Sequence, residues 1–185
     1  MIIRHKETVK SGFDGTVIDV ETVGEFLDHY PDSRRYKDHQ LVIFGYINRH
    51  GLEILCAEGE SSIDELIVEI RKIIDGLARP YYAFNSGFER GVLFYNLGMK
   101  VDFDRELQSE LIRGRESKAR AVGELGIPNY DDPFFDKGLL CMDAWAEGDF
   151  SSAIAHNRAC LLKERDILLK RGFRQPDELR LVGER

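Results

Sequence analysis

Two acidic residues interrupt a run of strand-forming residues near the start of the chain. Asp19 and Glu21 stand two positions apart in the sequence TVIDVET, which covers residues 16–22. Side chains at positions i and i+2 of a strand lie on the same face. Each carboxylate therefore makes it more costly for the other to ionise. The strand either lies at a sheet edge with a solvated face, or the pair binds a hard cation such as magnesium or manganese.

Further candidate residues follow in two later stretches. The sequence AFNSGFERGVL (83–93) predicts a strand that ends at Asn85 and a helix with Glu89 in its first turn. The helix dipole alone would favour a glutamate there, which is the alternative to a role in cation binding. The sequence AIAHNRACLLKERDILL (153–169) predicts a helix that carries His156 and, one turn later, Cys160.

Together these stretches resemble the DEDD superfamily of 3′–5′ exonucleases, over roughly residues 14–170. Asp19-Val20-Glu21 is similar to the first motif of that family. NSGFE is similar to the second, with Glu89 where the family usually has Asp. HNRAC resembles the Tyr-Asn-x-x-Asp form of the third motif in a predicted-exonuclease branch, with His156 at the aromatic position and Cys160 at the position of the fourth acid.

The resemblance implies an RNase H-like fold and a two-metal hydrolysis of the terminal phosphodiester of DNA or RNA. One or two ions of Mg²⁺ or Mn²⁺ would be the cofactor. Asp19 would bridge both ions, Glu21 would bind the ion that activates water, and Glu89 would be an outer ligand. His156 would orient or deprotonate the water. The expected partner is nucleic acid with a single-stranded 3′ end.

Cys160 departs from the family pattern, because a thiol is a poor ligand for magnesium. Glu164 shares the helix face of Cys160 one turn later and is a candidate replacement. Asp166 points elsewhere by its angular offset, and Asp143 belongs to another helix. Alternatively, Cys160 is a small apolar residue of the core, and His156 is a buried, hydrogen-bonded histidine without a catalytic role.

Two functions therefore stay open. The first is a metal-dependent 3′–5′ exonuclease. The second is a catalytically degenerate domain, derived from such an exonuclease, that binds nucleic acid or has a regulatory role. Trp145 is expected in the core. A run of basic residues either lines a groove for phosphates or forms a solvated helix face. The run consists of Arg113, Arg115, Lys118 and Arg120.

The elements that must position these residues form an α/β layered domain. Strand 16–21 is expected at the centre of a mixed sheet of about five strands, flanked by helices, with the hairpin 41–48/52–58 antiparallel on one side and strand 81–85 parallel on the other. The helices are expected after Ser61 and before Pro80, and over 88–96, 104–125 (broken at Gly114), 138–147 and 151–170. A loop over 125–138 and a polar tail from Arg171 complete the expected elements.

Composition narrows the class of protein. The chain has 185 residues, 43% hydrophobic and 32% charged, which suits a single domain over residues 1–185. The resemblance implies that this domain is RNase H-like. Its net charge of −7 argues against binding polyanions by bulk charge. No apolar run is long enough for a bilayer, and the N-terminus lacks the apolar stretch of a signal peptide. Three cysteines without CxxC spacing favour reduced thiols, so we expect a cytoplasmic protein and no membrane partner.

Overall fold

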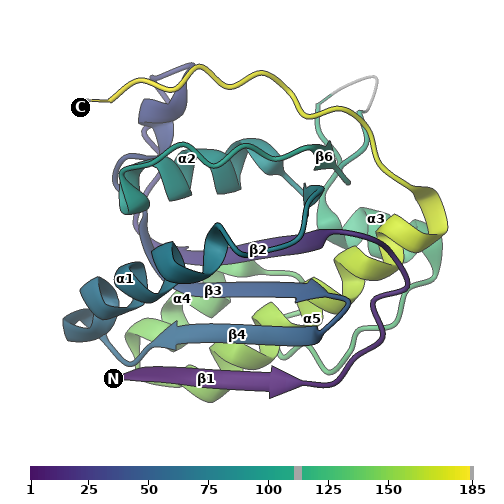
Figure 1. Cartoon of the computed structure of the whole chain (residues 1–185), viewed down its shortest axis with the longest axis horizontal. Coiled ribbons are helices and arrows are strands. Elements are labelled where there is room, and N and C mark those ends of the chain that lie inside the picture. The colour runs from purple at the N-terminus through teal and green to yellow at the C-terminus, as the bar shows by residue number, and fades with distance from the viewer. Residues whose placement is uncertain (111–113, 184–185) are drawn as a thin grey trace.

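A six-stranded mixed sheet forms the centre of the computed structural model, which describes residues 1–110 and 114–183 (Figure 1). Its strand order is β1-β4-β3-β2-β5-β6. The strands are β1 (Ile2–Glu7), β2 (Thr16–Val23), β3 (Gln40–Asn48), β4 (Gly51–Ala57), β5 (Tyr81–Ala83) and β6 (Arg105–Glu106). The predicted α/β class with a mixed, RNase H-like sheet is confirmed, with one strand more than the expected five.

The acidic strand β2 lies inside the sheet, as the sequence predicts. It pairs antiparallel with β3 and parallel with β5. β3 and β4 form the predicted hairpin, in which Asn48 pairs with Gly51 across a two-residue loop. Because β2 has a neighbour on each side, the explanation of its acids as the solvated face of an edge strand is wrong.

The helices pack on the sheet through their apolar residues. They are α1 (Ile63–Ile74), α2 (Ser86–Leu97), α3 (Lys118–Leu125), α4 (Gly138–Ala146) and α5 (Phe150–Arg171). Leu66, Ile70 and Ile74 of α1 recur at helical spacing and are buried. Helix α5 packs against β2, β3 and β4, and Figure 1 shows α4 and α5 behind β3 and β4. This long contact places α5 directly against the strand that carries the acidic pair.

Two segments differ from the sequence prediction. Residues 2–7, to which we assign no element from sequence, form β1 along the free edge of β4. The predicted helical region 104–125 is wrong over 104–110, where β6 pairs parallel with β5, and over 114–117, while its residues 111–113 lie outside the described part of the chain. The backbone N–H groups of Leu107 and Gln108 donate to Ala83 O and Phe84 O. These long-range hydrogen bonds override the weak helix propensity of a charged segment.

The remaining predictions about location concern the surface and the membrane. The expected polar tail crosses back over the fold, where Val182 N donates to Ser33 Oγ at 2.7 Å. Arg113 of the basic run lies outside the described residues. Among residues 1–110 and 114–183, no helix combines the length and the apolar character that a membrane crossing requires.

Candidate metal centre

All five side chains singled out from the sequence line one cleft of about 630 Å³. Lys118, from the first residue of α3, lines the same cleft. The structure thus brings together residues from β2, α2, α3 and α5 that are up to 141 positions apart (160 − 19). The predicted members of this group are Asp19, Glu21, Glu89, His156 and Cys160.

Asp19 lies at the centre of the group and is only 4% exposed. Its Oδ2 accepts a hydrogen bond from Asn157 Nδ2 at 2.7 Å, and its Oδ1 accepts one from Lys118 Nζ at 3.0 Å. Asn157 reaches this position because Gly45 pairs opposite Asp19 on β3. A Cβ at Gly45 would lie 2.0 Å from Asn157 Oδ1. The glycine therefore allows α5 to approach the sheet and to hold the carboxylate.

Glu21 projects beside Asp19, as strand alternation predicts. Asn157 Nδ2 lies 3.4 Å from Glu21 Oε1 and so bridges the two acids. Burial and the charge of Asp19 raise the pKa of Glu21 to about 7. The β2–β3 register shifts directly after Glu21, as bulges often do next to functional sites. Ligand atoms of Asp19, Glu21 and Cys160 lie within 4.8 Å of one another, which is close enough to share one cation.

Glu89 is buried in the first turn of α2, with 3% of its surface exposed. Burial, then Glu164 and Asp19, raise its pKa well above the usual range. Its Oε2 has no hydrogen-bond partner in the part of the chain that the structure describes. A favourable interaction with the helix dipole requires no burial, so the dipole alone does not account for this unpartnered oxygen.

Glu164, which the sequence offers only as a replacement for Cys160, is the fourth acid of the centre. Its side chain is 0% exposed, and Lys118 Nζ lies 2.6 Å from its Oε1. Its other oxygen, Oε2, has no partner among the described residues. Burial raises the pKa of Glu164 well above its ordinary value, against the attraction of Lys118. Only helical spacing from Cys160 signals this residue in the sequence.

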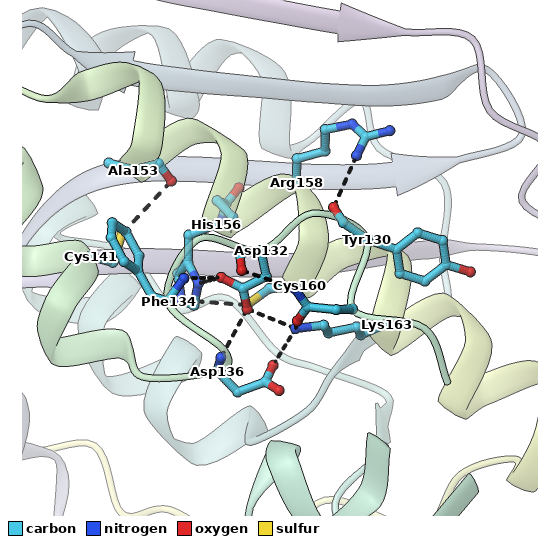
Figure 2. Close-up of polar contacts among 12 residues, drawn as sticks. Tyr130, Asp132, Phe134, Asp136, Cys141, Ala153, His156, Arg158, Cys160 and Lys163 are labelled. Atoms are coloured by element: carbon cyan, nitrogen blue, oxygen red, sulfur yellow. Dashed lines mark hydrogen bonds and ion pairs between the residues drawn. The ribbon is translucent and has the colours of Figure 1, made fainter. Parts of the chain in front are cut away.

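His156 is held in one orientation by Asp132, which sequence reasoning missed (Figure 2). His156 Nδ1 lies 2.7 Å from Asp132 Oδ1, and His156 Nε2 lies 3.8 Å from Glu21 Oε1. Burial opposes a charge on the ring, but Cys160, Asp132 and Glu21 outweigh it and raise the pKa of His156 to about 11. A protonated imidazole donates hydrogen bonds, so this geometry favours orienting a ligand over accepting a proton.

Cys160 completes a line of Cys, His and Asp side chains, with Sγ 3.6 Å from His156 Nε2. That order is shared with nucleophilic triads. Burial raises the pKa of the Cys160 thiol to about 11, and the nearby charge of Asp19 acts in the same direction. Because the thiolate is the reactive form, this environment is unsuited to a cysteine nucleophile.

Asp132 also anchors the loop before α4. Its carboxylate accepts hydrogen bonds from the backbone N–H groups of Phe134 and Asp136 at 2.9 Å and from Lys163 Nζ at 2.7 Å. Lys163 is fully buried and also contacts Asp136 Oδ1 at 2.8 Å (Figure 2). The only signal in the sequence is an Asp before Pro in a turn-rich stretch, which predicts a turn and not its partners.

We expect Asp132→Asn to lower the free energy of unfolding by about 3 kcal/mol, because it removes one charge of a buried ion pair. Urea unfolding of the purified variant measures this loss. Asp131→Asn is the matched control, since Asp131 is exposed and its positive φ of 59° suits asparagine. A loss below about 1 kcal/mol in Asp132→Asn, similar to that of the control, would show that the buried ion pair is not an anchor.

The other residues considered from sequence lie outside the centre. Trp145 is buried in the core and donates from Nε1 to Ala57 O at 2.8 Å, as predicted. Asp166 pairs with Arg165, and Asp143 is exposed. Arg115 pairs with Asp177, and Arg120 pairs with Glu124. Of the described members of the basic run, Lys118 alone lines the cleft.

The donor set suits a hard divalent cation. Carboxylate oxygens are the ligands that magnesium and manganese prefer, and one buried oxygen each of Glu89 and Glu164, the Oε2 atom, has no partner among the described residues. Comparisons with protein-family models, with curated proteins and with solved structures find no match. The function must therefore be inferred from the side chains of this cleft.

Proposed function

We propose that this protein is a metal-dependent nuclease that hydrolyses the terminal phosphodiester at the 3′ end of a single-stranded nucleic acid. The observation that carries the proposal is the convergence of four carboxylates on one centre, three of them buried and three of them lining one cleft, with two cationic side chains beside them. The acids are Asp19, Glu21, Glu89 and Glu164, and the cations are Lys118 and His156. Burying so many like charges is costly unless a cation neutralises them.

Some of these side chains would bind the cation, and others would hold its ligands in position. Asp19 and Glu21 would hold the cation, with Cys160 beside them. When bound, such a cation activates water and stabilises the charge that develops on the phosphate. Asn157 fixes the orientation of Asp19, and Asp132 fixes that of His156. His156 then faces the acidic pair with Nε2, in position to orient a water or a phosphate oxygen.

The walls of the cleft favour an unpaired strand. Apolar and aromatic side chains line it beside the acids, including Phe26, Phe88, Leu139 and Met142. Phe26 is 47% exposed and Leu139 is 73% exposed. Unstacked bases bind to such surfaces irrespective of sequence, whereas paired bases are stacked inside a duplex and are not available.

Cys160 and Lys118 favour a second candidate, a degenerate domain that binds nucleic acid without cleaving it. A thiol stands at the position of the family's fourth acid, and an ammonium group lies among the carboxylates. Such a domain would bind a strand equally well with and without a divalent cation.

Oligonucleotides of DNA and RNA labelled at the 5′ end distinguish the two candidates. With Mn²⁺, and more weakly with Mg²⁺, we expect a ladder of products shortened from the 3′ end, and a chelator should abolish it. Manganese should be the better cofactor because it tolerates the softer Cys160 ligand. Binding of the same oligonucleotides without hydrolysis, unchanged by chelator, would favour the degenerate domain.

A further inference from the structure

The ammonium group of Lys118 occupies the space between two of the buried carboxylates. Its Nζ lies 3.0 Å from Asp19 Oδ1 and 2.6 Å from Glu164 Oε1. Its side chain is 17% exposed and lines the cleft. Lys118 therefore contacts both the buried acids and the space that a ligand would enter.

The local sequence gives no reason for a lysine at this position. Lys118 is the first residue of α3, after the N-cap Ser117, and a cation there opposes the helix dipole. Its ammonium group is instead paired with Asp19 at 3.0 Å and with Glu164 at 2.6 Å. The acidic centre, and not its own helix, thus accounts for a cation at this position.

Lys163 is a buried lysine with a structural role, and its surroundings differ from those of Lys118. Its ammonium group is fully buried and lies 2.7 Å from Asp132, 2.8 Å from Asp136 and 3.3 Å from Asn129. Lys163 itself does not line the cleft, and of its three partners only Asp136 does. Lys118 instead lines the cleft, and its partner Glu164 keeps one oxygen, Oε2, without a partner among the described residues.

Asp19 separates the acidic centre into two parts. On one side its Oδ1 and Glu164 contact the ammonium group of Lys118. On the other side, ligand atoms of Asp19, Glu21 and Cys160 lie within 4.8 Å of one another, and the positive neighbour of Glu21 is His156, whose Nε2 lies 3.8 Å from Glu21 Oε1. Lys118 therefore bridges two carboxylates directly in one part, whereas the other part keeps three ligand atoms close enough to share a cation beside the more distant His156.

We propose that Lys118 supplies the positive charge of one of the two cations that metal-dependent phosphodiester hydrolysis commonly uses, so that this protein binds a single divalent cation beside Asp19 and Glu21. This inference rests on the function proposed above. A lysine ammonium is a compact charge with three donors, which suits a phosphate oxygen of the bound strand. The structure thereby assigns Lys118 as a substrate-contacting residue.

Calorimetric titration of the cation-free protein with MnCl₂ tests the inference without an activity measurement. We expect one ion per wild-type chain and two per chain of Lys118→Met, since methionine has a similar length and no charge. Lys118→Arg retains the charge and should bind one ion. Lys163→Met is the matched control for loss of a buried lysine and should also bind one. Electron paramagnetic resonance should show an isolated Mn²⁺ in the wild type and a spin-coupled pair in Lys118→Met.

The outcomes separate this inference from the proposed function. Two ions per wild-type chain, or one ion in Lys118→Met with unchanged affinity, would overturn the role of Lys118 and leave a metal-dependent nuclease standing. No binding by either protein would overturn both proposals. Should Lys118→Met fail to fold, the wild-type stoichiometry decides, because one ion supports the inference and two contradict it.

Discussion

Asp19→Asn should abolish both cation binding and hydrolysis. Asp19 accepts hydrogen bonds from Asn157 and Lys118, and its carboxylate lies within 4.8 Å of a Glu21 oxygen. Losing an outer partner of a metal ligand already weakens metal affinity by 10–100-fold, so removing this charge should weaken manganese binding by at least ~100-fold. Hydrolysis should fall by roughly 1,000-fold, because a bound cation contributes several kcal/mol to transition-state stabilisation.

Asp19→Asn preserves the shape of the side chain, and Asp14, which lies nearby in the sequence, provides its control. Asparagine has the size of aspartate and keeps one of the two acceptor oxygens that Asn157 and Lys118 use, so the variant should fold and give the far-ultraviolet circular dichroism of the wild type. Asp14→Asn removes an exposed carboxylate just before β2 and should leave binding and hydrolysis unchanged. Wild-type manganese affinity in Asp19→Asn, measured by calorimetry, would exclude this cleft as the metal centre.

Local patterns were sufficient to predict the part of the fold that carries the acidic pair. Strand alternation places Asp19 and Glu21 on one face, and the two-residue turn after Asn48 sets the pairing of β3 with β4. Helical spacing places Glu164 on the face of Cys160. These relations depend on residues that are near in sequence, which is why they can be read from it.

The parts that sequence reasoning missed depend on distant partners. β6 exists because Tyr82 and Ala83 offer a parallel edge to Arg105 and Glu106. The role of Asp132 depends on His156, which lies 24 positions later on α5. Lys118 is predicted only as part of a basic run, since no local pattern indicates that it reaches Asp19, 99 positions earlier. Spacing thus predicts that Asp19 and Glu21 lie together, and the family resemblance implies that Glu89 joins them, whereas their counter-charges require the structure.

Cys160→Asp is the substitution that we expect to couple stability to cation binding most strongly. Cys160 is buried, and its Sγ lies with the Asp19 and Glu21 oxygens inside a span of 4.8 Å. A new carboxylate there would be desolvated and repelled by both acids, and His156, whose Nε2 lies 3.6 Å from the present Sγ, would offset only part of this cost. Without a cation we expect a loss of about 3 kcal/mol, at the lower end of the cost of an unpaired buried charge. For a chain of this length that corresponds to a melting temperature lower by roughly 10 °C.

Manganese should reverse most of this loss, because the new carboxylate is a better ligand for a divalent cation than the neutral thiol. An ion at 100 times its dissociation constant stabilises the native state by about 2.7 kcal/mol. Melting scans with and without MnCl₂ should therefore show a larger recovery in Cys160→Asp than in the wild type, and hydrolysis should increase. Cys56→Asp is the matched control, since Cys56 is also buried but neither lines the cleft nor has its sulfur within 4.8 Å of the acidic pair and His156. If manganese raises the melting temperature of both variants equally, Cys160 does not stand beside the cation, and the position of the fourth acid is not part of the metal centre.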